Sequence, residues 1–364
     1  MNTISTRRST PRRLGLGLVG GISALALTAC AGAADSGSGD STATDTVTLV
    51  THDSFAVSDE VLAAFEEESG LTVKQVAPGD GGALVNQLVL TKDAPLGDVV
   101  FGIDNTFATR AIDEGVLDPY TPAGLAASAA QYAVGDGELT PVDVGDVCVN
   151  VDHAWFSAQG VPEPATLDDL TKPEYKDLLV VTNPATSSPG LSFLLATVGA
   201  YGTSDSGDGW EGYWSRLKDN GVKVVDGWSD AYSVDFSGGE GKGQRPLALS
   251  YSTSPAFTVS EDGTSTTTGA LLDTCFRQVE YAGVLAGAKN PEGAQQLVDF
   301  LVSDAFQADV ADNMYMYPAN ADIALPEGWA EFAPLSPEPY EVSPADITAH
   351  RDEWIKTWTS TVIG

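Results

Sequence analysis

Basic residues are scarce in this sequence, which has 18 lysines and arginines against 51 aspartates and glutamates and a formal net charge of −33. A protein that binds nucleic acid needs a basic face to neutralise the phosphates. The charge balance therefore excludes nucleic acid as a partner. The acidic surface biases the protein toward cationic ligands, although solubility outside the cell would also account for it.

Histidine and cysteine are also rare, with three of each. The motifs G-x-S-x-G and H-E-x-x-H, which carry the nucleophile or the metal ligands of common hydrolases, do not occur. Neither Cys148 nor Cys275 has a histidine or cysteine partner at metal-ligand spacing. We therefore expect a protein that is not an exported hydrolase or any other enzyme, with no metal site and no cofactor.

Long apolar runs are missing except for one near the N-terminus, from Leu14 to Leu27. This run follows several arginines and is too short and too rich in glycine for a membrane span, which needs about 20 residues. The layout is that of a secretory signal. The run ends on Leu27-Thr28-Ala29-Cys30, which resembles the bacterial lipoprotein signal. We expect a signal peptide over 1–30 and a lipid anchor at Cys30 on the outer face of the cell membrane, with export by the general or the twin-arginine route.

A small, polar segment follows the signal, and we interpret residues 31–45 (AGAADSGSGDSTATD) as a flexible tether. About 320 residues remain after it, enough for two lobes and a sizeable core. Cys148 and Cys275 are the one cysteine pair left in this exported chain. Cysteine pairs in exported proteins are commonly oxidised, because the compartment outside the cytoplasm is oxidising. The sequence therefore predicts a disulfide between them.

Strand and helix patterns alternate from residue 46 onward. Short β-branched stretches predict strands, and stretches with a capping residue and an apolar face predict helices. The predicted order is strand 46–51, helix 58–70, strand 71–77, helix 83–92, strand 98–104 and helix 106–115. Such alternation predicts a parallel sheet with helices on its faces.

The alternation restarts near residue 140. Further strands are predicted over 146–152, 178–184, 222–227, 246–253 and 276–285, and helices over 190–202, 209–221, 290–313 (with a break near Ser303) and 343–363. Two α/β lobes in one tethered chain are typical of a hinged solute-binding protein, whose site lies between the lobes. We expect lobe 1 over 46–142 and about 278–325, lobe 2 over 143–277, and a C-terminal helical segment over 326–364 that packs back on the lobes.

Polar and aromatic residues follow the predicted strands. His52, Asp53 and Ser54 come after the first strand, and "PGDGG" with Asp80 and Gly81 comes after the second. The later strands lead into "NPATSSPG", "DGWSDAY" and "STSPAF". Any one of these turns is unremarkable, but together they predict a binding site at the carboxyl ends of the strands.

The stretch "DGWSDAYSVDFSGG" (226–239) holds two large rings, Trp228 and Tyr232, in a polar loop that lacks apolar neighbours. The rings could pack back onto a helix as a satellite core, or they could cover a ligand. The stretch alone leaves both interpretations open.

Several motifs resemble those of the thiamine-binding proteins of bacterial ABC importers, a family of the type II periplasmic-binding-protein class. They are "DSFAVSDEVLAAFEEESGLTVKQVAPGDGG", "GDVVFGIDN", "NPATSSPGLSFLL", "VVDGWSDAY", "LSYSTSPAF", "FRQVEYAGV" and "MYMYPAN". The likeness runs in order from about residue 47 to 358. It implies a monomeric, two-lobed binding protein that carries thiamine, or its phosphates, to an ABC permease and its ATPase.

The resemblance also implies a set of ligand-binding residues. They are His52, Asp53, Ser54, Asp80, Gly81, Ser187, Trp228, Tyr251, Phe257 and Tyr315. Three of these depart from the family pattern: His52 and Phe257 stand where tyrosine is usual, and Tyr315 where tryptophan is usual. These changes leave thiamine, a phosphate ester and a pyrimidine precursor as alternative ligands.

The predicted site residues suit a thiamine-like ligand. Trp228, Phe257 and Tyr315 can cover a flat aminopyrimidine and a cationic thiazolium, and Asp53 or Asp80 can accept from the amine or offset the positive charge. Ser187 precedes a helix and could bind the alcohol or a phosphate with the help of free backbone N–H groups. A polyamine binder of the same fold is the better alternative, and a ferric-ion binder is the other.

Overall fold

The computed structural model describes residues 45–203, 209–239 and 242–364. The predicted signal peptide, Cys30 and all but the last residue of the predicted tether lie outside the described residues. Within the part of the chain that the structure describes, no helix is long and apolar enough to cross a membrane.

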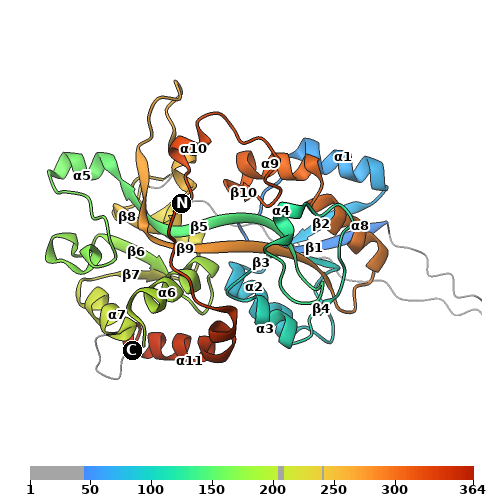
Figure 1. Cartoon of the computed structure of the whole chain (residues 1–364), viewed down its shortest axis with the longest axis horizontal. Helices are drawn as coiled ribbons and strands as arrows, with labels where there is room; N and C mark the ends of the chain where they lie inside the picture. Colours follow the sequence, from blue (N-terminus) through green and yellow to red (C-terminus); the bar gives the residue numbers. More distant parts are fainter. Residues whose placement is uncertain (1–44, 204–208, 240–241) are drawn as a thin grey trace, which may run out of the picture. The chain divides into compact units, whose positions relative to one another are not determined.

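One mixed sheet organises residues 45–364 (Figure 1), and its main path runs β2-β1-β3-β9-β5-β8-β6-β7. In the described residues its strands are β1 (Thr46–Thr51), β2 (Thr72–Val76), β3 (Val99–Asp104), β4 (Leu117–Asp118), β5 (Thr140–Asp152), β6 (Leu179–Thr182), β7 (Lys223–Val225), β8 (Leu247–Tyr251), β9 (Thr268–Leu285) and β10 (Tyr317–Pro318). We call β2, β1 and β3 the first half of the sheet, and β8, β6 and β7 the second half.

The first half is built from the βα alternation that the sequence predicts. β1 pairs in parallel with β2 and with β3, and the helices between them are α1 (Asp59–Ser69), α2 (Gly81–Leu90) and α3 (Ala108–Asp113). Ser58 caps α1 by accepting from the backbone N–H of Val61, and Gly70 ends it in the left-handed conformation that glycine adopts at low cost. Local capping signals thus fixed these boundaries.

The second half repeats this arrangement. β6 pairs in parallel with β7 and with β8, and α6 (Ser188–Tyr201) and α7 (Trp210–Asp219) follow β6 along the chain. The remaining helices are α4 (Ala127–Ala130), α5 (His153–Gln159), α8 (Pro291–Leu301), α9 (Asp304–Met314), α10 (Trp329–Phe332) and α11 (Pro344–Val362), with the short turns η1 (Asp169–Thr171), η2 (Pro173–Tyr175), η3 (Asp230–Asp235) and η4 (Ser254–Thr258).

Two long antiparallel strands, β5 and β9, run side by side through the middle of the sheet and join its halves (Figure 1). Both are longer than the sequence predicts. β5 begins six residues before the predicted start at 146, and β9 begins eight before the predicted start at 276. Polar residues interrupt the apolar pattern in both extensions, and only pairing between the two strands makes them extended. The predicted α/β fold is confirmed, whereas the predicted lobe boundaries remain a prediction.

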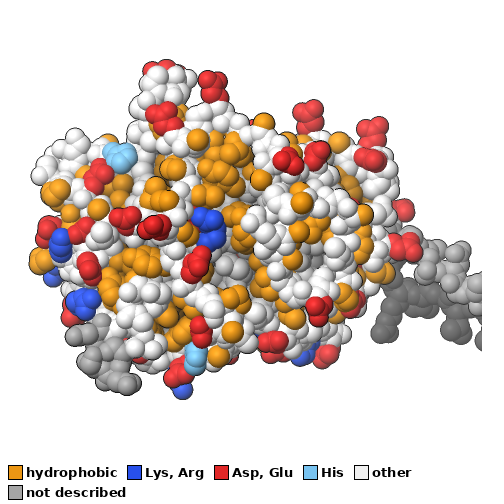
Figure 2. Space-filling view, in the orientation of Figure 1, with side chains coloured by type: hydrophobic (Ala, Val, Ile, Leu, Met, Phe, Trp, Pro, Cys, Tyr) orange, Lys and Arg blue, Asp and Glu red, His pale blue; other side chains and the backbone are white. Residues whose placement is uncertain are grey.

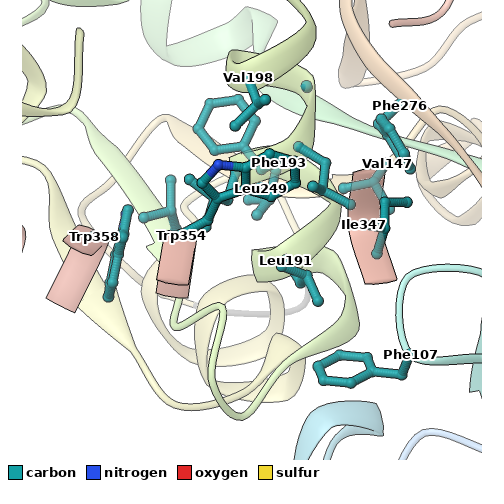
Figure 3. Close-up of a cluster of buried hydrophobic side chains, with 14 of the residues drawn as sticks. Phe107, Val147, Leu191, Phe193, Val198, Leu249, Phe276, Ile347, Trp354 and Trp358 are labelled. Carbon is teal, nitrogen blue, oxygen red and sulfur yellow. The ribbon is translucent and has the colours of Figure 1, made fainter. Parts of the chain in front are cut away.

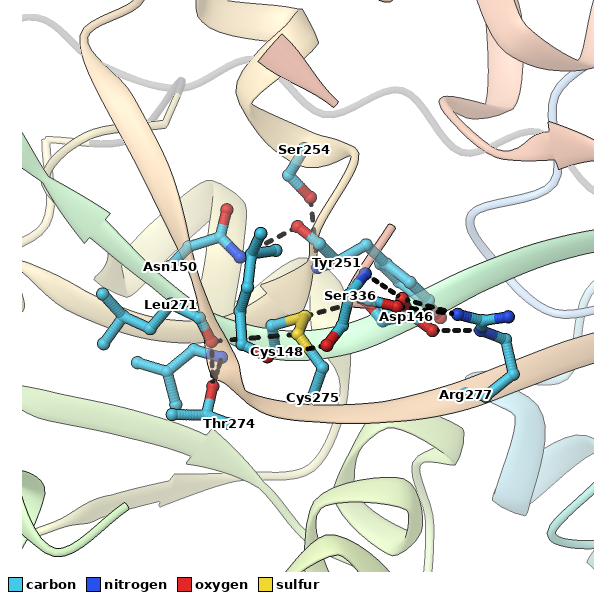
Figure 4. The surroundings of a disulfide bond; sticks show 12 residues. Asp146, Cys148, Asn150, Tyr251, Ser254, Leu271, Thr274, Cys275, Arg277 and Ser336 are labelled. Atoms are coloured by element: carbon cyan, nitrogen blue, oxygen red, sulfur yellow. Dashed lines mark hydrogen bonds and ion pairs between the residues drawn. A yellow bond between two sulfur atoms is a disulfide. The ribbon is translucent and has the colours of Figure 1, made fainter. Parts of the chain in front are cut away.

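The register of β5 and β9 shifts where Val147 pairs with Phe276 and Val149 with Leu271. Cys148 and Cys275 lie at this irregularity and form a disulfide, as the sequence predicts (Figure 4). Both cysteines are fully buried. Thr274 stabilises the irregularity because its hydroxyl accepts from the backbone N–H of Val149 at 3.0 Å. The bridge therefore ties β5 to β9 where the two halves of the sheet meet.

The C-terminal helix α11 packs against the interior of the protein through one face. Trp354 and Trp358 of this face lie against a cluster of buried apolar side chains that includes Phe193 of α6 (Figure 3). Trp358 contacts Trp214 of α7 edge to face, with 5.4 Å between ring centroids. A fully buried aromatic ring stabilises a fold by a few kcal/mol, so α11 is an integral part of the protein and not a loose extension.

Candidate functional site

A cavity of about 270 Å³ opens where strands of both halves of the sheet end. This volume is close to the lower end of the range for small-molecule sites, about 300–1,000 Å³. The residues that line it are His52, Asp53, Ser54, Asp80, Gly81, Ser188, Pro189, Trp228, Tyr232, Ser233, Tyr251, Ser254, Phe257, Glu280, Asn313, Met314, Tyr315 and Met316.

His52 follows β1, and each of its ring nitrogens faces a neighbouring polar group. Its Nδ1 accepts from the backbone N–H of Ser54 at 3.1 Å, and its Nε2 lies 3.5 Å from Oε1 of Glu280. A ring that accepts at Nδ1 carries a proton on Nε2, the nitrogen that faces Glu280. Burial lowers the pKa of His52, but the neighbouring negative charges, chiefly Glu280, outweigh it and the pKa is raised.

Gly102 of β3 makes room for the His52 ring. A Cβ at this position would lie 2.2 Å from Cδ2 of His52, and the backbone φ of 97° is one that other residues rarely adopt. The imidazole therefore lies directly over the backbone of the neighbouring strand.

Asp80 caps α2, and its carboxylate joins three segments of the chain. Its Oδ1 accepts from the backbone N–H of Gly81 at 2.5 Å and of Ser188 at 3.1 Å, and its Oδ2 accepts from the backbone N–H of Trp228 at 2.8 Å. Burial raises the pKa of Asp80, while these hydrogen bonds oppose the rise. Because Ser188 and Trp228 follow strands of the second half, Asp80 links the two halves at the cavity.

Gly81 and Gly82 let the start of α2 touch the loop between β6 and α6. A Cβ at Gly82 would lie 2.6 Å from the carbonyl carbon of Thr186, and one at Gly81 would lie 2.1 Å from Oγ of Ser188. The backbone N–H of Ala83 donates to the carbonyl of Thr186 at 2.8 Å. This contact between backbones closes one side of the cavity.

Trp228 both packs against the protein and lines the cavity, so it fits each of the two interpretations that the sequence leaves open. Its ring lines the cavity and stacks on Tyr232, with 5.1 Å between centroids and 11° between planes. Its Nε1 donates to Oγ of Ser250 at 2.8 Å. Tyr232 packs in a small cluster with Phe236. The indole is therefore fixed from behind by the protein and presents one face to the cavity.

Three further aromatic residues complete the lining. Tyr251 ends β8, and burial, followed by the charge of Glu280, raises the pKa of its hydroxyl well above the ordinary value. Phe257 and Tyr315 meet edge to face with 5.4 Å between centroids. Phe257 is 41% exposed, and Tyr315 ends α9 in a left-handed conformation with φ of 54°. This pair lies at the rim, between η4 and α9.

Glu280 of β9 lies between two other acids on neighbouring strands. It pairs in register with Asp104 of β3 and with Asp143 of β5. Burial raises the pKa of Asp104 to about 7, and the charge of Glu280 contributes. Burial, followed by the charge of Glu280, raises the pKa of Asp143 well above the ordinary value. We call Asp104, Glu280 and Asp143 the acid row.

Nine of the ten predicted ligand-binding residues line this cavity, and Ser187 does not. Ser187 is fully buried, where its hydroxyl donates to Oγ1 of Thr182 at 2.8 Å and caps α6. Its neighbour Ser188 lines the cavity instead. Sequence reasoning also missed Glu280. A single acid inside the apolar stretch "VEYAGVL" is a signal that could have found it, because burying a carboxylate costs free energy unless it is paired or hydrogen-bonded.

Basic side chains are missing from the lining, in which His52 is the only group able to carry positive charge. The visible face of the molecule has acidic side chains spread over it and few basic ones (Figure 2). No cluster of three or more metal-binding side chains occurs among residues 45–203, 209–239 and 242–364.

The fold and the cavity define a solute-binding protein. A family model described as bacterial extracellular solute-binding protein matches residues 94–334, and the chain belongs to this family. It is 32% identical to the thiamine-binding periplasmic protein of Escherichia coli (strain K12) over 323 residues, which cover 87% of this chain and 93% of that protein. It is 31% identical over 323 residues to the thiamine-binding periplasmic protein of Salmonella typhimurium (strain LT2), with the same shares covered.

A solved structure named periplasmic thiamin binding protein has a TM-score of 0.75 to this chain at 30% identity. The match covers 87% of this chain and 96% of that one. The described sheet, helices and cavity thus belong to the periplasmic binding protein fold.

Proposed function

We propose that this protein captures thiamine outside the cytoplasm and delivers it to an ABC permease and ATPase, acting as a monomer. The observation that carries the proposal is the cavity, in which the fixed indole of Trp228 presents a ring face among carboxylates. A cation over an aromatic face gains about 0.5–2 kcal/mol. The names of the related proteins support thiamine as the ligand.

The aromatic pair at the rim supports the same ligand. Phe257 of η4 and Tyr315 at the end of α9 both line the cavity, and their rings are in contact edge to face. A flat heteroaromatic ligand that enters between them and Trp228 would have rings on more than one side. Thiamine offers two such rings, a neutral aminopyrimidine and a cationic thiazolium, so both stacking and charge can contribute.

We also propose that the mature protein is exported and anchored by a lipid on Cys30. The basis is the Leu27-Thr28-Ala29-Cys30 junction, which follows the apolar run. The small, polar residues 31–45 would let the folded part reach a permease in the same membrane.

Isothermal titration of the purified protein tests the ligand. We expect thiamine to bind with a submicromolar dissociation constant, which corresponds to a binding free energy of about −8 kcal/mol or more negative. Spermidine and ferric ion represent the two alternative ligand classes of this fold. Binding of either one in place of thiamine would overturn the proposal and identify the alternative.

A further inference from the structure

We infer that Ser250 is a positioning residue for the ligand: it does not line the cavity, but it sets the orientation of two groups that do, the indole of Trp228 and the hydroxyl of Ser254. The inference rests on the proposed function, because it takes thiamine as the ligand that meets these two groups. Ser250 lies in β8 and is fully buried.

The hydrogen bonds of Ser250 have a fixed direction. An indole N–H can only donate, so Oγ of Ser250 accepts from Nε1 of Trp228 at 2.8 Å. Oγ of Ser250 also lies 2.7 Å from Oγ of Ser254. If Ser254 donated in this contact, the proton of Ser250 would have no acceptor among the described residues, in a side chain that water does not reach. Buried hydroxyls are almost always paired, so Ser250 donates to Ser254.

The hydroxyl of Ser254 then has a proton left for a ligand. Its oxygen accepts from Ser250 and from the backbone N–H of Tyr251 at 3.2 Å (Figure 4). Its own proton has no acceptor within the part of the chain that the structure describes, and Ser254 lines the cavity. The side chain therefore offers a donor to a hydrogen-bond acceptor on the ligand, such as a pyrimidine nitrogen of thiamine.

The same segment also holds the ring behind the indole. The hydroxyl of Tyr232 donates to the backbone carbonyl of Ser254 at 3.3 Å, and Tyr232 stacks on Trp228. Two rings that are four residues apart are thus bonded to two serines that are four residues apart. The segment from β8 to η4 fixes the plane of the stack, because each ring is held at its polar atom.

One buried residue therefore links the ring face to the donor. The indole plane depends on the acceptor that Ser250 provides, and the free proton of Ser254 depends on the donor that Ser250 provides. A flat ligand that stacks on Trp228 and accepts from Ser254 needs both groups in place at once. Groups that are oriented before binding lose less conformational entropy when the ligand arrives, so the loss of Ser250 should weaken binding without removing any ligand contact.

Isothermal titration with thiamine tests the effect on affinity. Ser250→Ala should weaken binding about tenfold, since it leaves the indole N–H without its acceptor. The matched control is Ser192→Ala in α6. Ser192 is also fully buried, its hydroxyl has no partner among the described residues, and it lies outside the cavity lining. This control should leave the affinity unchanged, and thermal melts in parallel identify any loss of folded protein.

A double-mutant cycle with Trp228→Phe separates positioning from a general structural role. Phenylalanine has no N–H, so Ser250→Ala should weaken binding by less than about threefold in the Trp228→Phe background. Equal losses in both backgrounds would show that Ser250 does not act through the indole and would overturn the inference. Ser250→Thr keeps the hydroxyl and should retain most of the affinity, which also covers the case in which Ser250→Ala fails to fold.

Fluorine NMR of the ligand-free protein labelled with 5-fluorotryptophan observes the indole directly. The resonance of Trp228 is the one that Trp228→Phe lacks. Ser250→Ala should broaden or split this resonance, because the ring loses its fixed plane. Ser254→Ala should leave it single, because Ser250 still accepts from the indole. An unchanged Trp228 resonance in Ser250→Ala would overturn the inference.

The outcomes for the inference and for the proposed function are distinct. If Ser250→Ala binds thiamine as tightly as wild type, the positioning role is wrong and thiamine capture stands. If thiamine does not bind wild type, the proposed function is wrong, and with it the role of Ser250 toward that ligand. The fluorine spectrum still decides in that case whether Ser250 orients the indole.

Discussion

The carboxylate of Asp80 accepts a hydrogen bond from the backbone N–H of Trp228 at 2.8 Å, across 148 residues of sequence. One partner caps the helix after β2, and the other follows β7 at the opposite edge of the sheet. The bond therefore sets the position of the indole in the cavity from the other half of the sheet. It makes Asp80 a residue that positions the aromatic face.

Gly82→Ala should weaken thiamine binding about tenfold or more, because the new Cβ meets backbone atoms of Thr186 and Ser187 at 2.6–2.9 Å. The clash would separate α2 from the loop before α6 and stretch the bonds that Asp80 makes. Titration calorimetry measures the loss. Gly124→Ala is the matched control, since a Cβ there meets nothing within 4 Å. Equal affinities in both variants would contradict the role of the contact.

Trp228→Ala should weaken thiamine binding by about 1–3 kcal/mol, the scale of one aromatic stack, and Trp228→Phe should recover part of this loss. Thiamine should also quench the fluorescence of Trp228 in wild type. The control is Trp155→Ala, which removes a half-buried indole of α5 outside the cavity lining. If Trp228→Ala lowers the melting temperature but binds thiamine as tightly as wild type, the ring serves packing alone.

Removal of the disulfide should lower stability by about 2–5 kcal/mol, since the bridge closes a loop across a sequence separation of 127 residues. Denaturant titration of the double variant Cys148→Ala/Cys275→Ala measures the difference. Labelling of free thiols in denatured, unreduced wild type gives an independent check. We expect no label on either cysteine, and two labels per chain would rule the bridge out.

Asp104→Asn should change how stability depends on pH. The folded-state pKa of Asp104 is about 7, above the ordinary 3.8, so the folded protein retains this proton at pH values where the unfolded chain has lost it. The stabilisation from Asp104 is therefore complete below about pH 4 and is lost as pH rises toward 7. Relative to wild type, Asp104→Asn should gain melting temperature between pH 4.5 and 7.5. Parallel curves for the two proteins would contradict the raised pKa.

Cys30→Ala should release the protein into the medium or leave it unprocessed in the cell, because the acylated residue is gone. Fractionation of cells that produce either form, followed by mass spectrometry of the N-terminus, measures this. A variant that still sediments with membranes as a processed, lipid-bearing form would exclude Cys30 as the anchor.

The sequence by itself determined most of the helices and strands of the first half of the sheet. It also identified many of the residues that line the cavity. Ser58, Gly70 and Asp80 mark helix ends by local hydrogen bonding and backbone preference, which act between residues close in sequence. The polar and aromatic residues at strand ends could be collected on the same principle, because carboxyl ends of parallel strands face one side.

Tertiary structure decided which of these residues act together. Ser187 and Ser188 look alike in the sequence and both are buried, but only the packed structure places Ser188 in the cavity lining and Ser187 outside it. The acid row depends on the register among β3, β9 and β5, which pairing between distant strands alone sets. The charge environment of Glu280 follows from that register, because burial and neighbouring carboxylates come from segments up to 176 residues apart, a separation that no local signal spans.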